Sequence, residues 1–130
     1  MDPISEERAA LRIRVVGAVI ERDGAVLMAR RPPGRRHAGL WEFPGGKVEP
    51  GEDDPTALSR ELLEELAAPC VVGDLVAEGG DDRVVLACYR VRLLAAPIPL
   101  FHDQIAWVPL TDLRSLQTPP ADQAAVQALT

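Results

Sequence analysis

The stretch GKVEPGEDDPTALSRELLEELAA, residues 46–68, decides how this chain of 130 residues folds. Glu61, Glu64 and Glu65 are spaced so that, at about 3.6 residues per turn, they project from one face of a helix. An apolar stripe runs beside them and is formed by Leu58, Leu62 and Leu66. We therefore expect a helix that buries its leucines against a core and turns its glutamates outward.

The ends of this helix carry their own signals. Asp54 is a suitable N-cap, Pro55 takes the preferred first helical position, and Pro69 marks the end. Ahead of the helix, the glycine pair at 45–46 and Gly51 predict a loop with permissive backbone angles. Such a loop lets the main chain approach a metal or a phosphate.

Three carboxylates on one helix face repel one another, so a positive partner is expected. Hard divalent ions bind carboxylate and water oxygens together with substrate phosphates, which makes Mg²⁺ or Mn²⁺ the natural candidate. The alternative is a solvated acidic face, the usual interpretation of an arbitrary acidic run. The glycines, Glu52 and the segment Arg60-Glu61 that surround this run favour the metal.

The spacing of these residues resembles the signature of the Nudix hydrolases, and within that family the MutT-type nucleoside triphosphate pyrophosphohydrolases. The matching positions are Gly46, Glu52, Arg60, Glu61, Leu62, Glu64 and Glu65. The similarity extends to RVVGAVIERDGAVLMARRP, LWEFPGGKVEPGE, WVPLTDL and PPADQ. One position departs, because Ala67 stands where the family has a glycine in left-handed conformation. Ala adopts this conformation at a cost of about 1 kcal/mol, or Pro69 ends the helix differently.

The resemblance implies a fold and a reaction. The fold is the α/β/α sandwich of the Nudix family, with a mixed β-sheet between helices, as a single domain over residues 1–130. The reaction is metal-dependent hydrolysis of a nucleoside triphosphate to the monophosphate and pyrophosphate, with Mg²⁺ or Mn²⁺ as cofactor. Oxidised nucleotides such as 8-oxo-dGTP, or cytidine nucleotides, are the expected substrates.

The resemblance also implies the site residues. Glu61, Glu64 and Glu65 are expected to bind the metal, together with the backbone carbonyl of Gly46 or Gly45. Glu61 either binds the metal or activates the water, and Glu52 supports the metal site. Arg60 either orients the glutamates or, less readily, contacts the substrate; its guanidinium forms a rigid fork of donors.

A further acid is expected from the loop before Trp107. Many relatives have a glutamate six residues before that tryptophan, where this chain has Phe101. Asp103 or His102 is the candidate replacement, and Asp103 is preferred because its oxygens suit a hard cation. The alternative for Asp103 is an ordinary loop acid.

Four residues are candidates for substrate binding. Asp122 is expected to accept hydrogen bonds from the base, unless it caps the last helix. Lys47, the only lysine, contacts a phosphate or lies in solvent. Phe43 and Tyr89 border the base or pack in the core. Arginines at positions 30, 31, 35 and 36 either grip the triphosphate or belong to a solvated loop.

Composition limits the partners. The net charge of −6 disfavours binding to a nucleic-acid polymer. The sequence has no long apolar run and no signal-peptide pattern, so we expect a cytoplasmic protein without membrane contact, either monomer or homodimer. Cys70 and Cys88 are expected to be ordinary thiols.

Periodicity predicts the remaining elements. Strands are expected at residues 13–20, 25–29, 71–77, 84–94 and 104–109, a helix at 121–129, and a loop at 31–39. Asp23-Gly24 predicts a hairpin.

Two other functions remain: a noncatalytic nucleotide-binding module, disfavoured because every signature acid is present, and an ADP-ribose hydrolase. Family members that hydrolyse ADP-ribose commonly carry a proline downstream of the signature. This chain has no proline between Pro69 and Pro97, so this activity is disfavoured.

Overall fold

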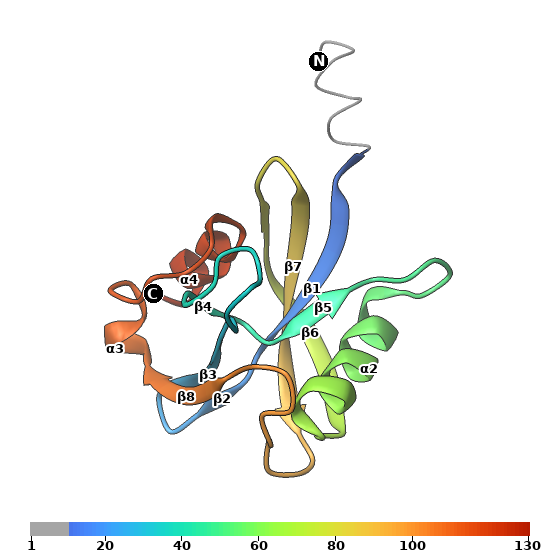
Figure 1. The fold of residues 1–130 in the computed structure, drawn as a ribbon. Helices are drawn as coiled ribbons and strands as arrows, with labels where there is room; N and C mark the ends of the chain where they lie inside the picture. The colour runs from blue at the N-terminus through green and yellow to red at the C-terminus, as the bar shows by residue number, and fades with distance from the viewer. Residues whose placement is uncertain (1–10) are drawn as a thin grey trace.

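A computed structural model describes residues 11–130, which form two four-stranded sheets with helices on both sides (Figure 1). In the first sheet the strand order is β5-β1-β7-β6, comprising Gly45–Lys47, Ile13–Val19, Val84–Leu93 and Cys70–Gly80. In the second, β3 (Ala25–Arg30) pairs with β2 (Glu21–Arg22), β4 (Trp41–Glu42) and β8 (Gln104–Pro109). Because β1 and β7 run parallel and the other pairs antiparallel, the architecture is mixed, as expected.

The first hairpin forms where the sequence predicts it. Asp23 and Gly24 both have positive φ, 50° and 77°, which is the backbone of a two-residue hairpin turn between β2 and β3. The strand before the turn does not stay in one sheet, however. It is interrupted at Ile20, so β1 pairs in the first sheet and β2 in the second. This bend joins the two sheets.

Strand β1 separates two apolar cores by its alternation. Val16 and Ala18 face the core that also contains the leucine stripe of α2 (Asp54–Leu66). Val19 points to the other core, which contains residues of α4 (Gln123–Leu129). Leu58, Leu62 and Leu66 are fully buried, so this half of the helix prediction is confirmed. Helices α2 and α4 thus cover different cores (Figure 1).

The start of α2 corrects one prediction. The N-cap is Asp53, whose side chain accepts from the Thr56 N–H at 2.9 Å, and Asp54 is already helical. Asp54 instead receives two hydrogen bonds from the Arg14 guanidinium, at 2.8 and 2.6 Å. The cap lies one residue earlier because Pro55 is compatible with the second helical position as well as the first.

The end of α2 shows how the chain replaces the family's glycine. Ala67 adopts the left-handed conformation itself, with φ 53° and ψ 29°. The N–H groups of Ala67 and Ala68 donate to the carbonyls of Leu63 and Leu62, at 3.1 and 3.3 Å. The helix end is therefore closed by backbone hydrogen bonds, and the first of the two expected geometries holds.

The sequence predicts a loop at the glycine pair 45–46, but these residues form strand β5. Gly46 pairs with Val16, and Gly45 with Gly17, in antiparallel register. A Cβ on Gly45 would lie 1.9 Å from the Val16 carbonyl oxygen. Glycine here allows two backbones to approach, rather than allowing a turn.

The other elements differ from the predictions mainly in their ends. The segment predicted at 71–77 extends to β6, Cys70–Gly80, and the last helix is preceded by the 3-10 turn η1, Pro120–Asp122. The segments at 84–94 and 104–109 correspond to β7 and β8, and residues 31–39 form turns, as expected. Short elements β4 and α3 (Leu110–Leu113) had no periodicity to reveal them. No helix among residues 11–130 is long and apolar enough to cross a membrane.

Candidate active site

Arg60 is the centre of the acidic cluster on α2. Its Nε and Nη2 donate to the two carboxylate oxygens of Glu52, at 2.9 and 2.8 Å. Nη1 donates to Glu61 at 3.0 Å and approaches Glu64 at 3.3 Å, while Nη2 also donates to the Lys47 carbonyl at 3.0 Å. Arg60 therefore ties the helix to the preceding segment and offsets part of the charge of the acids.

The three glutamates of α2 occupy different environments. Only Glu64 faces outward, with 58% of its side chain exposed, against 13% for Glu61 and 15% for Glu65. The expectation that all three acids look outward is thus wrong for two of them. Glu61 is covered by β5 and Glu65 by the loop before β8. These contacts arise from tertiary packing, so the helical period of the sequence does not predict them.

Burial changes the acidity of these two groups. Desolvation raises the pKa of Glu65 to about 8, and the negative charges of Glu61 and Glu42 add to this effect. Desolvation also raises the pKa of Glu61, against the opposing effect of Arg60. By contrast, the fork from Arg60 lowers the pKa of Glu52 to about 2. A nearby cation would stabilise the charged forms of Glu61 and Glu65.

Strand β5 passes directly over Glu61. A Cβ on Gly46 would lie 2.2 Å from the carboxyl carbon of Glu61 and 2.4 and 2.6 Å from its oxygens. A side chain at position 46 would fill the space that this carboxylate occupies. Gly46 therefore lies directly beside the Glu61 carboxylate.

The donor set of this region suits a hard divalent ion. Glu61, Glu64 and Glu65 supply carboxylate oxygens from neighbouring positions of α2, and Gly46 leaves the room that the Glu61 carboxylate occupies beside β5. Within residues 11–130, no group of three His, Cys, Asp or Glu side chains is already arranged as a metal cage. Arg60 now holds Glu61 and Glu64, so these acids have to turn from Arg60 to bind an ion.

The loop before β8 reverses the preference between its two candidate residues. Asp103 points away from the cluster and forms a two-bond ion pair with Arg30, at 2.9 and 3.0 Å. His102 is directed inward: its side chain is fully buried, and Nδ1 lies 3.9 Å from Glu65 Oε2. Asp103 is therefore not placed as a metal ligand. The sequence ranked the two by ligand chemistry, whereas the loop backbone decides which side chain enters.

A cavity of about 560 Å³ connects the acidic cluster to Asp122. Glu61 and Glu65 lie among its lining residues, as do Gly46, Lys47 and Phe43. Five basic side chains other than Lys47 also line it, namely Arg31, Arg35, Arg36, His37 and Arg83. The cavity thus offers acids for a cation, basic groups for phosphates and a buried acid at Asp122 in one continuous space.

Asp122 lies in this cavity and does not cap the last helix. Its side chain makes no capping hydrogen bond to α4; its Oδ2 instead accepts from the Phe43 N–H at 3.0 Å. Only 4% of the residue is exposed, and burial raises its pKa to about 8, with the charge of Glu42 adding to the effect. The capping alternative is therefore wrong, and Asp122 presents a carboxyl group to the cavity.

Tyr89 is separated from the cavity. It is on β7, packs with the core that contains the α2 leucines, and donates its hydroxyl to Asp54 Oδ2 at 2.5 Å. A role in substrate binding does not follow from this position, and the core-packing alternative fits. The sequence could not separate the alternatives because one strand alternates between the two cores.

The arginine-rich loop is tied down by ion pairs. Arg31 donates Nη1 to both oxygens of Glu42, at 2.9 and 3.1 Å, and Arg36 pairs with Asp81 at 3.4 Å. The Arg35 guanidinium lies 5.2 Å from the ring centre of Phe101. Arg30 forms an ion pair with Asp103 and does not line the cavity, whereas the arginines at positions 31, 35 and 36 do. Glu42, which sequence reasoning missed, is visible only as the charged residue between two aromatics in LWEFPGG.

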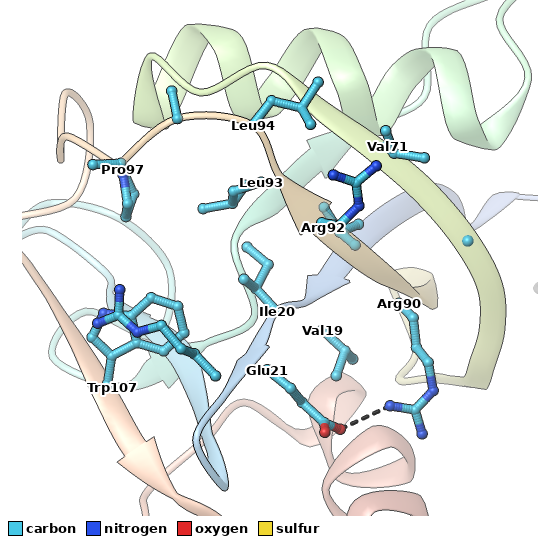
Figure 2. A pocket seen from close by; sticks show the side chains of 15 residues that line it. Val19, Ile20, Glu21, Val71, Arg90, Arg92, Leu93, Leu94, Pro97 and Trp107 are labelled. Carbon is cyan, nitrogen blue, oxygen red and sulfur yellow. Dashed lines mark hydrogen bonds and ion pairs between the residues drawn. The ribbon is translucent and has the colours of Figure 1, made fainter.

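A larger cavity, of about 780 Å³, lies elsewhere, beside Trp107 and the end of β7 (Figure 2). Arg22 covers the Trp107 ring at 4.0 Å, and Arg90 pairs with Glu21 at 2.8 Å. None of the α2 glutamates lines this cavity. Size therefore does not identify the candidate site; the placement of the acids does.

Comparisons with known proteins establish the family. A model of the NUDIX domain matches residues 11–129, so the chain belongs to the Nudix hydrolase family. It is 46% identical over 93 residues to the CTP pyrophosphohydrolase of Escherichia coli strain K12, covering 72% of this chain and 67% of that protein. It is 40% identical over 127 residues to the putative 8-oxo-dGTP diphosphatase 2 of Mycobacterium tuberculosis strain H37Rv, covering 91% and 87%.

A solved structure supports the same assignment. The MutT NUDIX hydrolase from Burkholderia pseudomallei superimposes with a TM-score of 0.76 at 28% identity, covering 92% of this chain and 98% of that one. The match confirms the predicted fold.

Proposed function

We propose that this protein is a metal-dependent nucleoside triphosphate pyrophosphohydrolase that releases the monophosphate and pyrophosphate. One observation carries the proposal: a single cavity has Glu61 and Glu65 among its lining residues and also Asp122, as a nucleotide with its phosphates and base requires. The names of the two relatives, a CTP pyrophosphohydrolase and a putative 8-oxo-dGTP diphosphatase, support a nucleoside triphosphate as the substrate. The proposal includes a single domain over residues 1–130.

Glu61, Glu64, Glu65 and the main chain of Gly46 are proposed to hold Mg²⁺ or Mn²⁺. When bound, the ion neutralises the phosphates and orients them for in-line attack by water. Arg60 keeps Glu52 and Glu61 in place through its fork of donors. Lys47 and the arginines that line the cavity offset the remaining phosphate charge.

Glu61 is proposed as the group that accepts the proton of the attacking water. Its carboxylate lies beneath Gly46 of β5 and lines the cavity, where the phosphates and the attacking water are proposed to bind. At the other end of the cavity, Asp122 is proposed to accept a hydrogen bond from an amino or ring N–H of the base, and Phe43 fixes the carboxyl group through its backbone N–H. Cytosine and 8-oxoguanine both carry such donors.

The proposed setting is the cytoplasm, where nucleotide pools are maintained. Both cysteines are free thiols: Cys88 is buried and Cys70 is partly buried. This is the state expected in a reducing compartment. The substrate is a free nucleotide, without a nucleic-acid polymer or a membrane as partner, and the enzyme is a monomer or a homodimer.

A substrate screen tests the proposal. The purified protein is incubated with nucleoside triphosphates, including CTP and 8-oxo-dGTP, and with ADP-ribose, in Mg²⁺ or Mn²⁺, and pyrophosphate and phosphate are measured separately. We expect pyrophosphate release from a triphosphate, dependent on the metal. Turnover of ADP-ribose alone would contradict the substrate class, and no turnover of any compound would indicate a noncatalytic binding module.

Substitutions locate the chemistry. Glu65→Gln conserves the shape of the side chain and removes its charge, so turnover is expected to fall at least about a hundredfold if this carboxylate binds the ion. Asp122→Asn is expected to change the ratio of kcat/KM between CTP and 8-oxo-dGTP. An unchanged ratio would show that Asp122 does not contact the base.

A further inference from the structure

The loop that precedes β8 is fastened to the end of α2. The N–H of Ile98 donates to the Leu66 carbonyl at 2.8 Å, and the N–H of Leu100 donates to the Glu65 carbonyl at 2.9 Å. His102 follows two residues later with a fully buried side chain. The backbone thus holds the imidazole against the helical turn that carries Glu65.

The two ring nitrogens of His102 face two different carboxyl groups. Nε2 lies 2.9 Å from Glu42 Oε2, and Glu42 is itself held on both oxygens by Arg31. Nδ1 lies 3.9 Å from Glu65 Oε2. Both Nδ1 of His102 and Oε2 of Glu65 are buried and have no hydrogen-bond partner. Buried polar atoms are usually paired, so this facing pair requires a partner.

The unpaired atoms can satisfy each other. Their separation of 3.9 Å is about 1 Å longer than a hydrogen bond. It is also too short for a water molecule in line between the two atoms, because two successive hydrogen bonds span more than about 5 Å. A hydrogen bond between the two atoms therefore requires their separation to shorten by about 1 Å. An imidazole nitrogen accepts from a neutral carboxyl group and donates to a carboxylate, so the contact forms in either case.

We propose that His102 is a positioning residue for the hydrolysis proposed above. Nε2 is anchored on Glu42, and Nδ1 hydrogen-bonds Glu65 and thereby fixes which oxygen of that carboxylate faces the cavity. The consequence for turnover rests on the proposed function, whereas the consequence for cation binding does not. Groups that orient a metal ligand in this way usually change metal affinity about 10- to 100-fold when they are lost.

Two amide substitutions separate the two ring nitrogens. The amide nitrogen of His102→Asn lies near the position of Nδ1, and that of His102→Gln near the position of Nε2. The dissociation constant of Mn²⁺ is measured by electron paramagnetic resonance on the full chain without nucleotide. We expect His102→Asn to remain within a factor of about three of the wild type and His102→Gln to lose about tenfold or more. Asp103→Asn, in the neighbouring outward-facing residue, is the control and is expected to leave Mn²⁺ affinity unchanged.

The inference would be overturned if the two His102 variants bound Mn²⁺ with equal affinity. This includes the case in which both lose affinity in proportion to their loss of unfolding free energy in urea. A second measurement needs no folded His102 variant. In ¹⁵N-histidine NMR of the wild type, the Nδ1 resonance of His102 is expected to shift on addition of Mg²⁺, and to stay in place in Glu65→Gln. The chain has two histidines, so His37→Asn assigns the signals. A resonance that ignores Mg²⁺ would also overturn the inference.

The outcomes keep the two proposals apart. A difference in Mn²⁺ affinity between the two variants, without turnover of any nucleotide, would refute the proposed function and support the positioning role. Metal-dependent turnover that is equal in both variants would support the proposed function and refute the positioning role.

Discussion

Two adjacent glycines of β5 are expected to respond very differently to the same substitution. A methyl group on Gly46 would lie 2.2 Å from the carboxyl carbon of Glu61, whereas carbon atoms in contact are about 3.5 to 4.0 Å apart. The Glu61 carboxylate therefore has to move by about 1.5 Å. Since the far end of a side chain yields more easily than a backbone, Gly46→Ala is expected to fold and to displace this carboxylate from Arg60.

The expected loss is in catalysis. A misplacement of about 1 Å in a catalytic group lowers rates about a hundredfold, which corresponds to about 2.7 kcal/mol of transition-state stabilisation. We expect kcat/KM for the preferred triphosphate to fall by at least this factor, with a loss of about 1 kcal/mol in unfolding free energy from the hydrogen bond to Arg60.

Gly45→Ala is the matched comparison. Here the methyl group would lie 1.9 Å from the Val16 carbonyl oxygen, which belongs to the β1 backbone. Relief requires separation of β5 from β1, so we expect a loss of about 3 kcal/mol in unfolding free energy from urea denaturation. If Gly46→Ala kept more than half of the wild-type kcat/KM, the placement of Glu61 beneath β5 as a catalytic requirement would be refuted.

Three further predictions concern stability and the Arg60 contacts. Burial raises the pKa of Asp122 from 3.8 to about 8. Between these values the folded protein holds a proton that the unfolded chain has lost, so the contribution of Asp122 to stability falls as pH rises from about 4 to about 8, by up to about 1.4 kcal/mol per pH unit. In urea denaturation, Asp122→Asn should therefore gain stability relative to the wild type as pH rises; parallel curves would contradict the buried acid. Ala67→Gly relieves the left-handed alanine at the helix end and should raise unfolding free energy by about 0.5 to 1 kcal/mol, and Tm by about 3 °C in calorimetry, after the larger entropy of the unfolded glycine is subtracted. A fall in Tm would show that the Ala67 methyl group packs favourably. Arg60→Lys keeps the charge and loses the fork to Glu52, so we expect about 1 to 2 kcal/mol less stability in urea denaturation, which an unchanged unfolding free energy would disprove.

The sequence by itself determined the acidic helix and its buried leucine face. The leucine stripe, the prolines and the spacing of the glutamates are local features, and the helical period converts them directly into faces. For the same reason Asp23-Gly24 predicted its hairpin, since the turn conformation depends on two residues alone. The seven matching positions of the Nudix signature added the fold and the reaction class, and the match to the family model confirmed the family.

The tertiary structure decided how these residues are used. Glu61 and Glu65 are buried because β5 and the loop before β8 cover them, and both segments are distant in the sequence. The choice of His102 over Asp103 depends on which way that loop turns its side chains. Asp122 enters the cavity because the Phe43 N–H, 79 residues away, binds its carboxyl group. Desolvation and long-range pairing arise only when the chain is folded, so no local pattern contains them.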